Sequence, residues 1–176
     1  MKGVCMKKAL LGSMAILLML SMTACSLFSP TEPKNFTCFD MTITLDNSFD
    51  DYATEEGDAS FVSDKHGYGV SVTKKDFYLF EDQNTPTPSS IEDFVAYENP
   101  HADITTETSD GVTYYIQERE VEGRDFTYLV ALYESTDAYW KVSFVCESHK
   151  FDKAKPHFLA FAQTVMFEAT DPVSLT

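Results

Sequence analysis

The chain has 176 residues, 44% of them apolar and 14% aromatic, which suits one folded domain and excludes wholesale disorder. Thirteen Lys and Arg residues face 28 Asp and Glu residues, so the net charge is −15. Such a chain would be repelled by a phosphate backbone, and we expect no nucleic-acid partner.

The first residues have the pattern of an export signal, expected over residues 1–24. Three lysines precede an apolar run over 9–20, and this run is shorter than the roughly 20 residues that a membrane-spanning helix needs. Residues 22–26 read Met-Thr-Ala-Cys-Ser and resemble the lipobox of bacterial lipoproteins, in which the cysteine receives a diacylglyceryl group. We therefore expect lipidation of Cys25. The alternative is an ordinary secretory signal that happens to contain a cysteine.

The segment after the signal predicts a tethered domain. Residues 25–35 contain the cysteine, two prolines and mixed polar residues, a composition typical of a linker. The folded domain is expected over 36–169 and a short tail over 170–176. Without the signal, ten basic residues face 28 acidic ones, a net charge of −18.

Alternating apolar and polar residues predict strands in the first half of the domain. Residues 39–45 predict one strand, with Phe39 on its apolar face. Residues 59–63 and 68–73 predict two strands of a hairpin whose turn contains a glycine. The segment 84–90 holds two prolines, which lack amide donors, and is excluded as a central strand.

Two segments have helical periodicity. Residues 90–97 predict a short helix, because Ser89 and Glu92 have the spacing of a capping box and Pro100 follows. Residues 152–164 predict the last helix, whose apolar side chains recur at helical spacing on one face.

Three runs joined by short turns lie between these helices. They cover residues 112–120, 126–133 and 139–147, and their close spacing predicts an antiparallel meander. The middle run is apolar on both faces, which predicts a strand with both sides covered. Residues 164–167 predict a short edge strand at the end of the domain.

Two parts of the chain together resemble a known family. Residues 36–45 with Phe49, and residues 139–144 followed by 151–167, resemble small Gram-positive bacterial lipoproteins with a PsbP-like (Mog-type) fold. The resemblance implies an α+β fold, an antiparallel sheet of about six to seven strands flanked by helices as an α/β/α sandwich. Relatives of this fold serve as a photosystem accessory subunit and a nuclear-transport cofactor, which implies a binding role. No functional residue transfers, since these motifs are packing patterns.

Cys38 and Cys146 are the thiols that remain in the mature domain once Cys25 is lipidated. Outside the cytoplasm, two such cysteines suggest a disulfide. Each could equally be a small buried apolar residue, so both alternatives stay open.

An acidic turn has part of the spacing of a calcium loop. Asp46, Ser48 and Asp50 occupy the first, third and fifth positions, but Asp51 replaces the sixth-position glycine, and Gly57 stands at the twelfth. An EF-hand is therefore excluded. A solvated acidic loop is one interpretation, and the other is looser cation binding by nearby carboxylates: Asp50, Asp51, Glu55, Glu56 and Asp58.

No other motif predicts chemistry. The four histidines, His66, His101, His149 and His157, lack the spacing of metal ligands. Residues 69–73 lack the closing glycine of a nucleophile elbow. We therefore expect no metal, no cofactor and no catalytic residue.

The export signal and the expected fold lead to one functional hypothesis. It is a lipid-anchored extracytoplasmic binding or accessory protein without catalytic activity, held at the bacterial cell membrane, whose protein or small-molecule partner is unknown. One alternative is a hydrolase or metal-dependent enzyme with a site assembled from distant residues. A third hypothesis is a structural envelope protein that self-associates.

Overall fold

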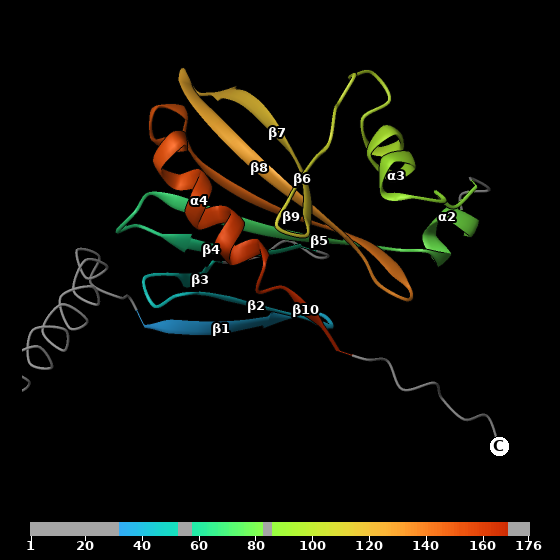
Figure 1. Ribbon diagram of the computed structural model, residues 1–176, viewed down its shortest axis with the longest axis horizontal. Helices are drawn as coiled ribbons and strands as arrows, with labels where there is room; N and C mark the ends of the chain where they lie inside the picture. Colours follow the sequence, from blue (N-terminus) through green and yellow to red (C-terminus); the bar gives the residue numbers. More distant parts are fainter. Residues whose placement is uncertain (1–31, 53–57, 83–85, 169–176) are drawn as a thin grey trace, which may run out of the picture. The chain divides into compact units, whose positions relative to one another are not determined.

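The structure is a computed structural model that describes residues 32–52, 58–82 and 86–168. Over these ranges the chain forms two antiparallel sheets (Figure 1). The larger sheet contains β3 (Asp50–Tyr52), β4 (Asp58–Ser63), β5 (Tyr68–Asp76), β6 (Glu107–Ser109), β7 (Val112–Val121), β8 (Arg124–Glu134) and β9 (Ala138–Glu147). The smaller sheet contains β1 (Pro33–Cys38), β2 (Met41–Asp46) and β10 (Met166–Phe167). The helical elements are α2 (Tyr78–Asp82), α3 (Ile91–Glu98), the 3₁₀ turn η2 (Ser148–Lys150) and α4 (Phe151–Ala162).

The larger sheet has the strand order β3-β4-β5-β9-β8-β7-β6. The β4–β5 hairpin and the β7-β8-β9 meander confirm the strands predicted from alternation. The β6–β7 and β7–β8 hairpins close with the two-residue turns Asp110-Gly111 and Glu122-Gly123, in which all four residues have positive φ. This is the type I′ geometry, whose twist matches that of the flanking strands.

One face of the larger sheet is covered by α4 and by β2 of the smaller sheet. Trp140, Val142 and Phe144 of β9 point to this face and are fully buried, as their alternation predicts. Phe158 of α4 stacks on Phe144 with ring centres 5.4 Å apart. The predicted last helix is therefore confirmed as the main cover of this core.

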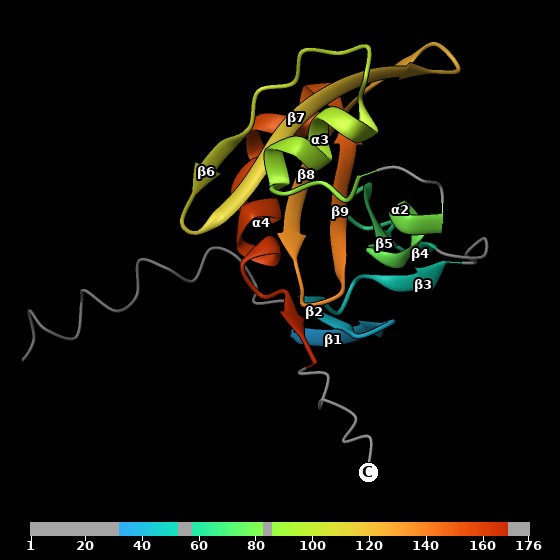
Figure 2. The ribbon, with the colours of Figure 1, turned by 90° about the vertical axis from the view of Figure 1, so that its right-hand side faces the viewer.

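The opposite face is covered by α2 and α3, and Figure 2 shows α3 in front of β8. Phe94 of α3 stacks on Tyr139 with ring centres 4.6 Å apart. The Tyr139 hydroxyl donates a hydrogen bond to the Pro88 carbonyl at 2.9 Å, which ties the segment before α3 to the sheet. Since Leu129 and Val130 are both buried, β8 is covered on both faces, as predicted.

The start of α3 differs by one residue from the expected cap. The Ser90 hydroxyl, not that of Ser89, accepts the hydrogen bond from the Asp93 amide, at 3.1 Å. The Ser89 hydroxyl instead donates to the Asp93 carboxylate. A serine followed by another serine offers two neighbouring caps, and spacing alone could not choose between them.

The first predicted strand is wrong in its limits. Residues 39–45 are not one strand, because Phe39 and Asp40 form the turn between β1 and β2. Phe39 has φ of 53° and is 46% exposed, so it does not belong to the apolar face. Residues 33–35, expected in the tether, pair with β2, so the folded domain begins at Pro33.

Besides β1, four short elements were not predicted: β3, β6, α2 and η2. Each of these four has three to five residues, too few for a periodic pattern to show. In the part of the chain that the structure describes, every helix is too short or too polar to cross a membrane.

Candidate functional site

A surface groove runs beside α4, and we call it the α4 groove. Its volume is about 490 Å³. Pro156, Leu159 and Ala160 give it an apolar part, while charged residues come from α4 and from the β6–β7 turn. The lining consists of Asp110, Asp152, Lys155, Pro156, Leu159, Ala160 and Gln163. No sequence motif predicted this groove, because it forms only where α4 lies near the β6–β7 hairpin.

Lys155 carries the positive charge of the α4 groove. Its Nζ lies 3.9 Å from a Glu107 carboxylate oxygen and 5.2 Å from the centre of the Tyr114 ring. The Tyr114 hydroxyl donates to the same carboxylate at 2.6 Å, and this hydrogen bond raises the pKa of Tyr114. The lysine is thus held near the sheet, beside apolar side chains, an arrangement that suits a ligand with both apolar and polar groups.

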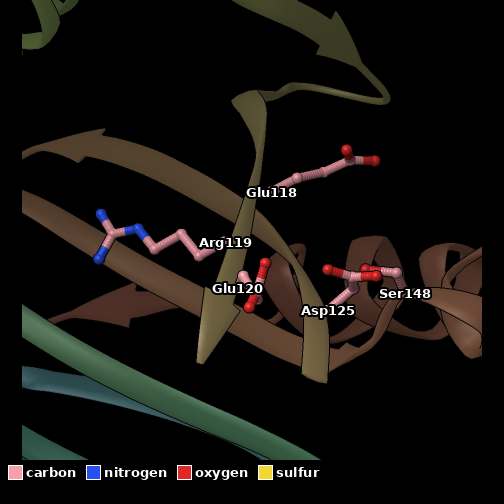
Figure 3. Close-up of a pocket in the computed structure, with 5 residues that line it drawn as sticks. All are labelled: Glu118, Arg119, Glu120, Asp125 and Ser148. Atoms are coloured by element: carbon pink, nitrogen blue, oxygen red, sulfur yellow. The ribbon is translucent and has the colours of Figure 1, made fainter. Parts of the chain in front are cut away.

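A second and smaller depression, of about 230 Å³, lies near the tip of the β7–β8 hairpin (Figure 3). Glu118 and Glu120 of β7 and Asp125 of β8 line it together with Ser148. Arg119 extends in the opposite direction from Glu118 and Asp125 in Figure 3. Along β7 the charges of Glu118, Arg119 and Glu120 alternate between negative and positive.

An ion cluster around the largely covered Lys74 lies at the surface where the two sheets approach each other. Lys74 Nζ is 2.8 Å from Asp40, 3.0 Å from Asp76 and 3.1 Å from Asp137, and it lies 5.3 Å from the centre of the Trp140 ring. Burial acts to lower the pKa of Lys74, but the three carboxylates outweigh it and the pKa is raised. Lys74 therefore stays charged, and we assign it a role in stabilising the fold and not in proton transfer.

The two cysteines are free thiols, so the bridge considered from the sequence is absent from the described residues. Cys38 ends β1 beside the Phe39 turn, and Phe39 contacts Trp140. Cys146 lies six residues further along β9 than Trp140, a distance of about 20 Å in a strand. Burial raises the pKa of both thiols to about 11, so both are poor nucleophiles.

In the acidic turn, the Asp46 carboxylate accepts hydrogen bonds from within the turn itself. Asp46 Oδ1 accepts from the Ser48 amide at 2.8 Å, while Asp50 and Asp51 are exposed on β3. Glu55 and Glu56, and the side chain of Asp58, lie outside the described residues. Cation binding by all five carboxylates therefore stays a prediction.

The histidines lie apart in the structure. His66 stacks on Tyr68, with ring centres 5.4 Å apart, and its Nε2 is 3.5 Å from Asp46. His101, His149 and His157 are exposed. Over the ranges that the structure covers, no three His, Cys, Asp or Glu side chains are arranged to hold a metal ion. Cys25 lies outside these ranges, and its lipidation stays a prediction.

Comparison with known proteins bears on the fold. No family model and no curated protein matches the chain. Among solved structures, cyanobacterial PsbP (CyanoP) from Synechocystis has a TM-score of 0.52 and 12% identity, over 84% of this chain and 99% of that one. The Ran-binding protein Mog1p of Saccharomyces cerevisiae has a TM-score of 0.50 and 9% identity, over 80% and 97% of the two chains.

A crystal structure from Bacteroides thetaiotaomicron has a TM-score of 0.54 and 10% identity over 74% of this chain. The match spans 46% of that longer chain. Identities of this size show the fold alone. The protein therefore has an α+β fold of the PsbP/Mog1 type, which confirms the fold expected from the sequence.

Proposed function

We propose that this protein is a small lipoprotein of the Gram-positive type, a binding or accessory module without catalytic activity that is anchored outside the cell membrane by the lipid on Cys25. The α4 groove is the observation that carries the binding role. It combines the apolar surface of Pro156 and Leu159 with the charge of Lys155, and it lies on a helix packed firmly on the sheet. Partner surfaces commonly combine apolar centres with charged rims.

Two further observations support this proposal. The lipobox-like residues 22–26 and the short apolar run before them support the anchor. The fold is also similar to that of Mog1p, which is a Ran-binding protein, and this similarity supports a binding role. We do not extend the same partner to this chain.

The binding role is tested by photo-crosslinking in intact cells. A photoreactive amino acid replaces Ala160, which is exposed in the α4 groove, and in a matched control it replaces Glu92, which is exposed on α3 over the opposite face. We expect a protein or small-molecule adduct, identified by mass spectrometry, at position 160 and not at 92. Equal labelling at both positions would contradict the proposal that the partner binds at the α4 groove. Turnover of esters, peptides or glycans by the full chain would reject the non-enzymatic role.

The anchor is tested by Cys25→Ser. We expect the parent protein to fractionate with membranes, and its N-terminal peptide to carry acyl chains by mass spectrometry. The variant should appear in the soluble fraction, because two or more acyl chains are needed for stable attachment. Equal membrane attachment of the variant and the parent would contradict the anchor.

A further inference from the structure

β7 has a long edge without a strand partner. It pairs with β6 only at Val112, Thr113 and Tyr114. Over residues 115–121 its outer side pairs with no strand in the described part of the chain, while its inner side pairs with β8. On every second residue of this segment, the backbone N–H and C=O groups therefore point outward and can pair with another strand. The tip of the β7–β8 hairpin extends past α3 at the upper right of Figure 2.

The other edges in the described ranges are shorter or protected. β3 and β6 have three residues each, and β10 has two. β1 has six residues but begins with Pro33 and Lys34, which are typical of a blocked edge. The segment 115–121 contains neither proline nor glycine.

Charge alternates along this edge. Glu118 and Glu120 lie on one face of β7 and are exposed, while Arg119 extends from the other face (Figure 3). The Arg119 guanidinium lies 5.5 Å from the centre of the Tyr128 ring, which holds it against the sheet. Ile116 and Val121, 38% and 44% exposed, add apolar surface at the two ends.

This charge pattern argues against a second copy of the chain as the occupant in antiparallel pairing. Residues that face each other across an antiparallel pair share a sheet face, so Glu118 would lie opposite Glu118 of the copy when residues 115–121 of both copies overlap fully. A shift of two residues toward the hairpin tip would place Glu118 opposite Glu120 and Arg119 opposite Arg119. Like charges placed directly opposite each other are destabilising. A strand that complements this edge would carry a basic residue opposite each glutamate and an acidic residue opposite Arg119.

We propose that residues 115–121 of β7 bind an extended segment of a partner protein by antiparallel strand addition, and that this segment carries basic, acidic and basic residues in succession. The basic side chains would contact Glu120 and Glu118, and the acidic one would contact Arg119. Backbone hydrogen bonds supply affinity and the alternating charges supply specificity, as in other cases of strand addition. This inference rests on the proposed binding role and adds a second surface to the α4 groove.

The test uses the labelled heptapeptide TVKEKTV, whose central Glu would face Arg119. Binding to the full chain in mild detergent is followed by fluorescence anisotropy at low salt. The scramble TVKKETV keeps composition and net charge but places Lys opposite Arg119 and Glu opposite Glu118. We expect TVKEKTV to bind about tenfold more tightly, since each matched pair contributes roughly 0.2–1 kcal/mol and each like-charge pair opposes binding.

Two controls separate strand addition from general attraction to an acidic protein. A TVKEKTV peptide methylated at the amides that face β7 keeps its charges but cannot donate these hydrogen bonds, and it should lose binding. Glu118→Lys/Glu120→Lys should also lose binding, whereas Asp50→Lys/Asp51→Lys makes the same charge change on exposed residues of β3 and should keep it.

Equal binding of the two peptides, or full binding of the methylated one, would overturn the inference. So would a dimer, detected by light scattering, that competes with the peptide, since it would assign this edge to a second copy. If the peptide fails while position 160 still crosslinks in cells, the edge inference falls and the proposed binding role stands.

Discussion

Lys74 shows how one side chain joins parts of the chain that are distant in sequence. Its carboxylate partners come from the β1–β2 turn, from β5 and from the β8–β9 turn. The lysine side chain is 14% exposed, so its charge is balanced mainly by these partners. Asp137 also accepts from the Ser135 hydroxyl at 2.8 Å, and this bond together with Lys74 lowers the pKa of Asp137.

Lys74→Met should destabilise the domain by about 1–3 kcal/mol, because methionine keeps the length but leaves three neighbouring carboxylates without a cation. Chemical denaturation at pH 7 measures this difference, and Lys153→Met, at an exposed position of α4, is the control. A loss no larger than that of the control would contradict the role of the cluster.

The same variant has a defined pH dependence. The pKa of Lys74 is raised, so its contribution is complete below the ordinary value of 10.5 and is lost as pH rises above it. The pKa of Asp137 is lowered, so its contribution is present above the ordinary value of 3.8 and is lost as pH falls below it. The stability gap between parent and variant should therefore be constant from about pH 5 to 9 and narrow on both sides.

At the scale of elements, the hairpin turns determine strand register. In the β7–β8 turn Glu122 has φ of 52° and Gly123 has φ of 75°. No atom lies within 4 Å of a Cβ placed on Gly123. Glycine is therefore required at position 123 by the positive φ of the backbone and not by a lack of space for a side chain.

This turn gives a pair of opposite predictions. Glu122→Asn should stabilise the domain by about 0.5–1 kcal/mol, because Asn-Gly is favoured in type I′ turns, and Gly123→Ala should destabilise it by about 1–2 kcal/mol. Thermal unfolding of both variants provides the measurement. Changes of the same sign in the two variants would contradict the assigned turn.

At the scale of the whole domain, one sheet carries two cores. Phe94 belongs to the core under α2 and α3, whereas Trp140, the single tryptophan of the chain, lies in the core under α4. Both cores use adjacent residues of β8 and β9. We therefore expect the two faces to unfold together.

Phe94→Ala tests this coupling, with Trp140 as a reporter on the opposite face. The variant should lose about 3–5 kcal/mol, and the transitions seen by Trp140 fluorescence and by far-UV circular dichroism should coincide. Glu92→Gln, at an exposed position of the same helix, should change stability little. An early transition seen by circular dichroism alone would show that α3 unfolds separately.

The local pattern of the sequence predicted the elements that are long enough to show a period. The β7-β8-β9 meander and α4 were predicted correctly, because alternation, helical spacing and short turns act between near neighbours in the chain. The same reasoning misplaced Phe39, since nothing local distinguishes an aromatic turn residue at positive φ from a residue of the apolar face.

The sequence by itself determined an acidic α+β domain with the pattern of its main strands and last helix, and it predicts an export signal before that domain. Tertiary structure alone decided how distant segments are placed: the carboxylates around Lys74, the α4 groove and the separation of the two thiols. It also decided where β6 ends, beyond which the outer edge of β7 has no strand partner among the described residues. The reason is physical. Propensity and periodicity are set within a few residues, whereas grooves, ion clusters and open edges depend on packing between segments tens of residues apart.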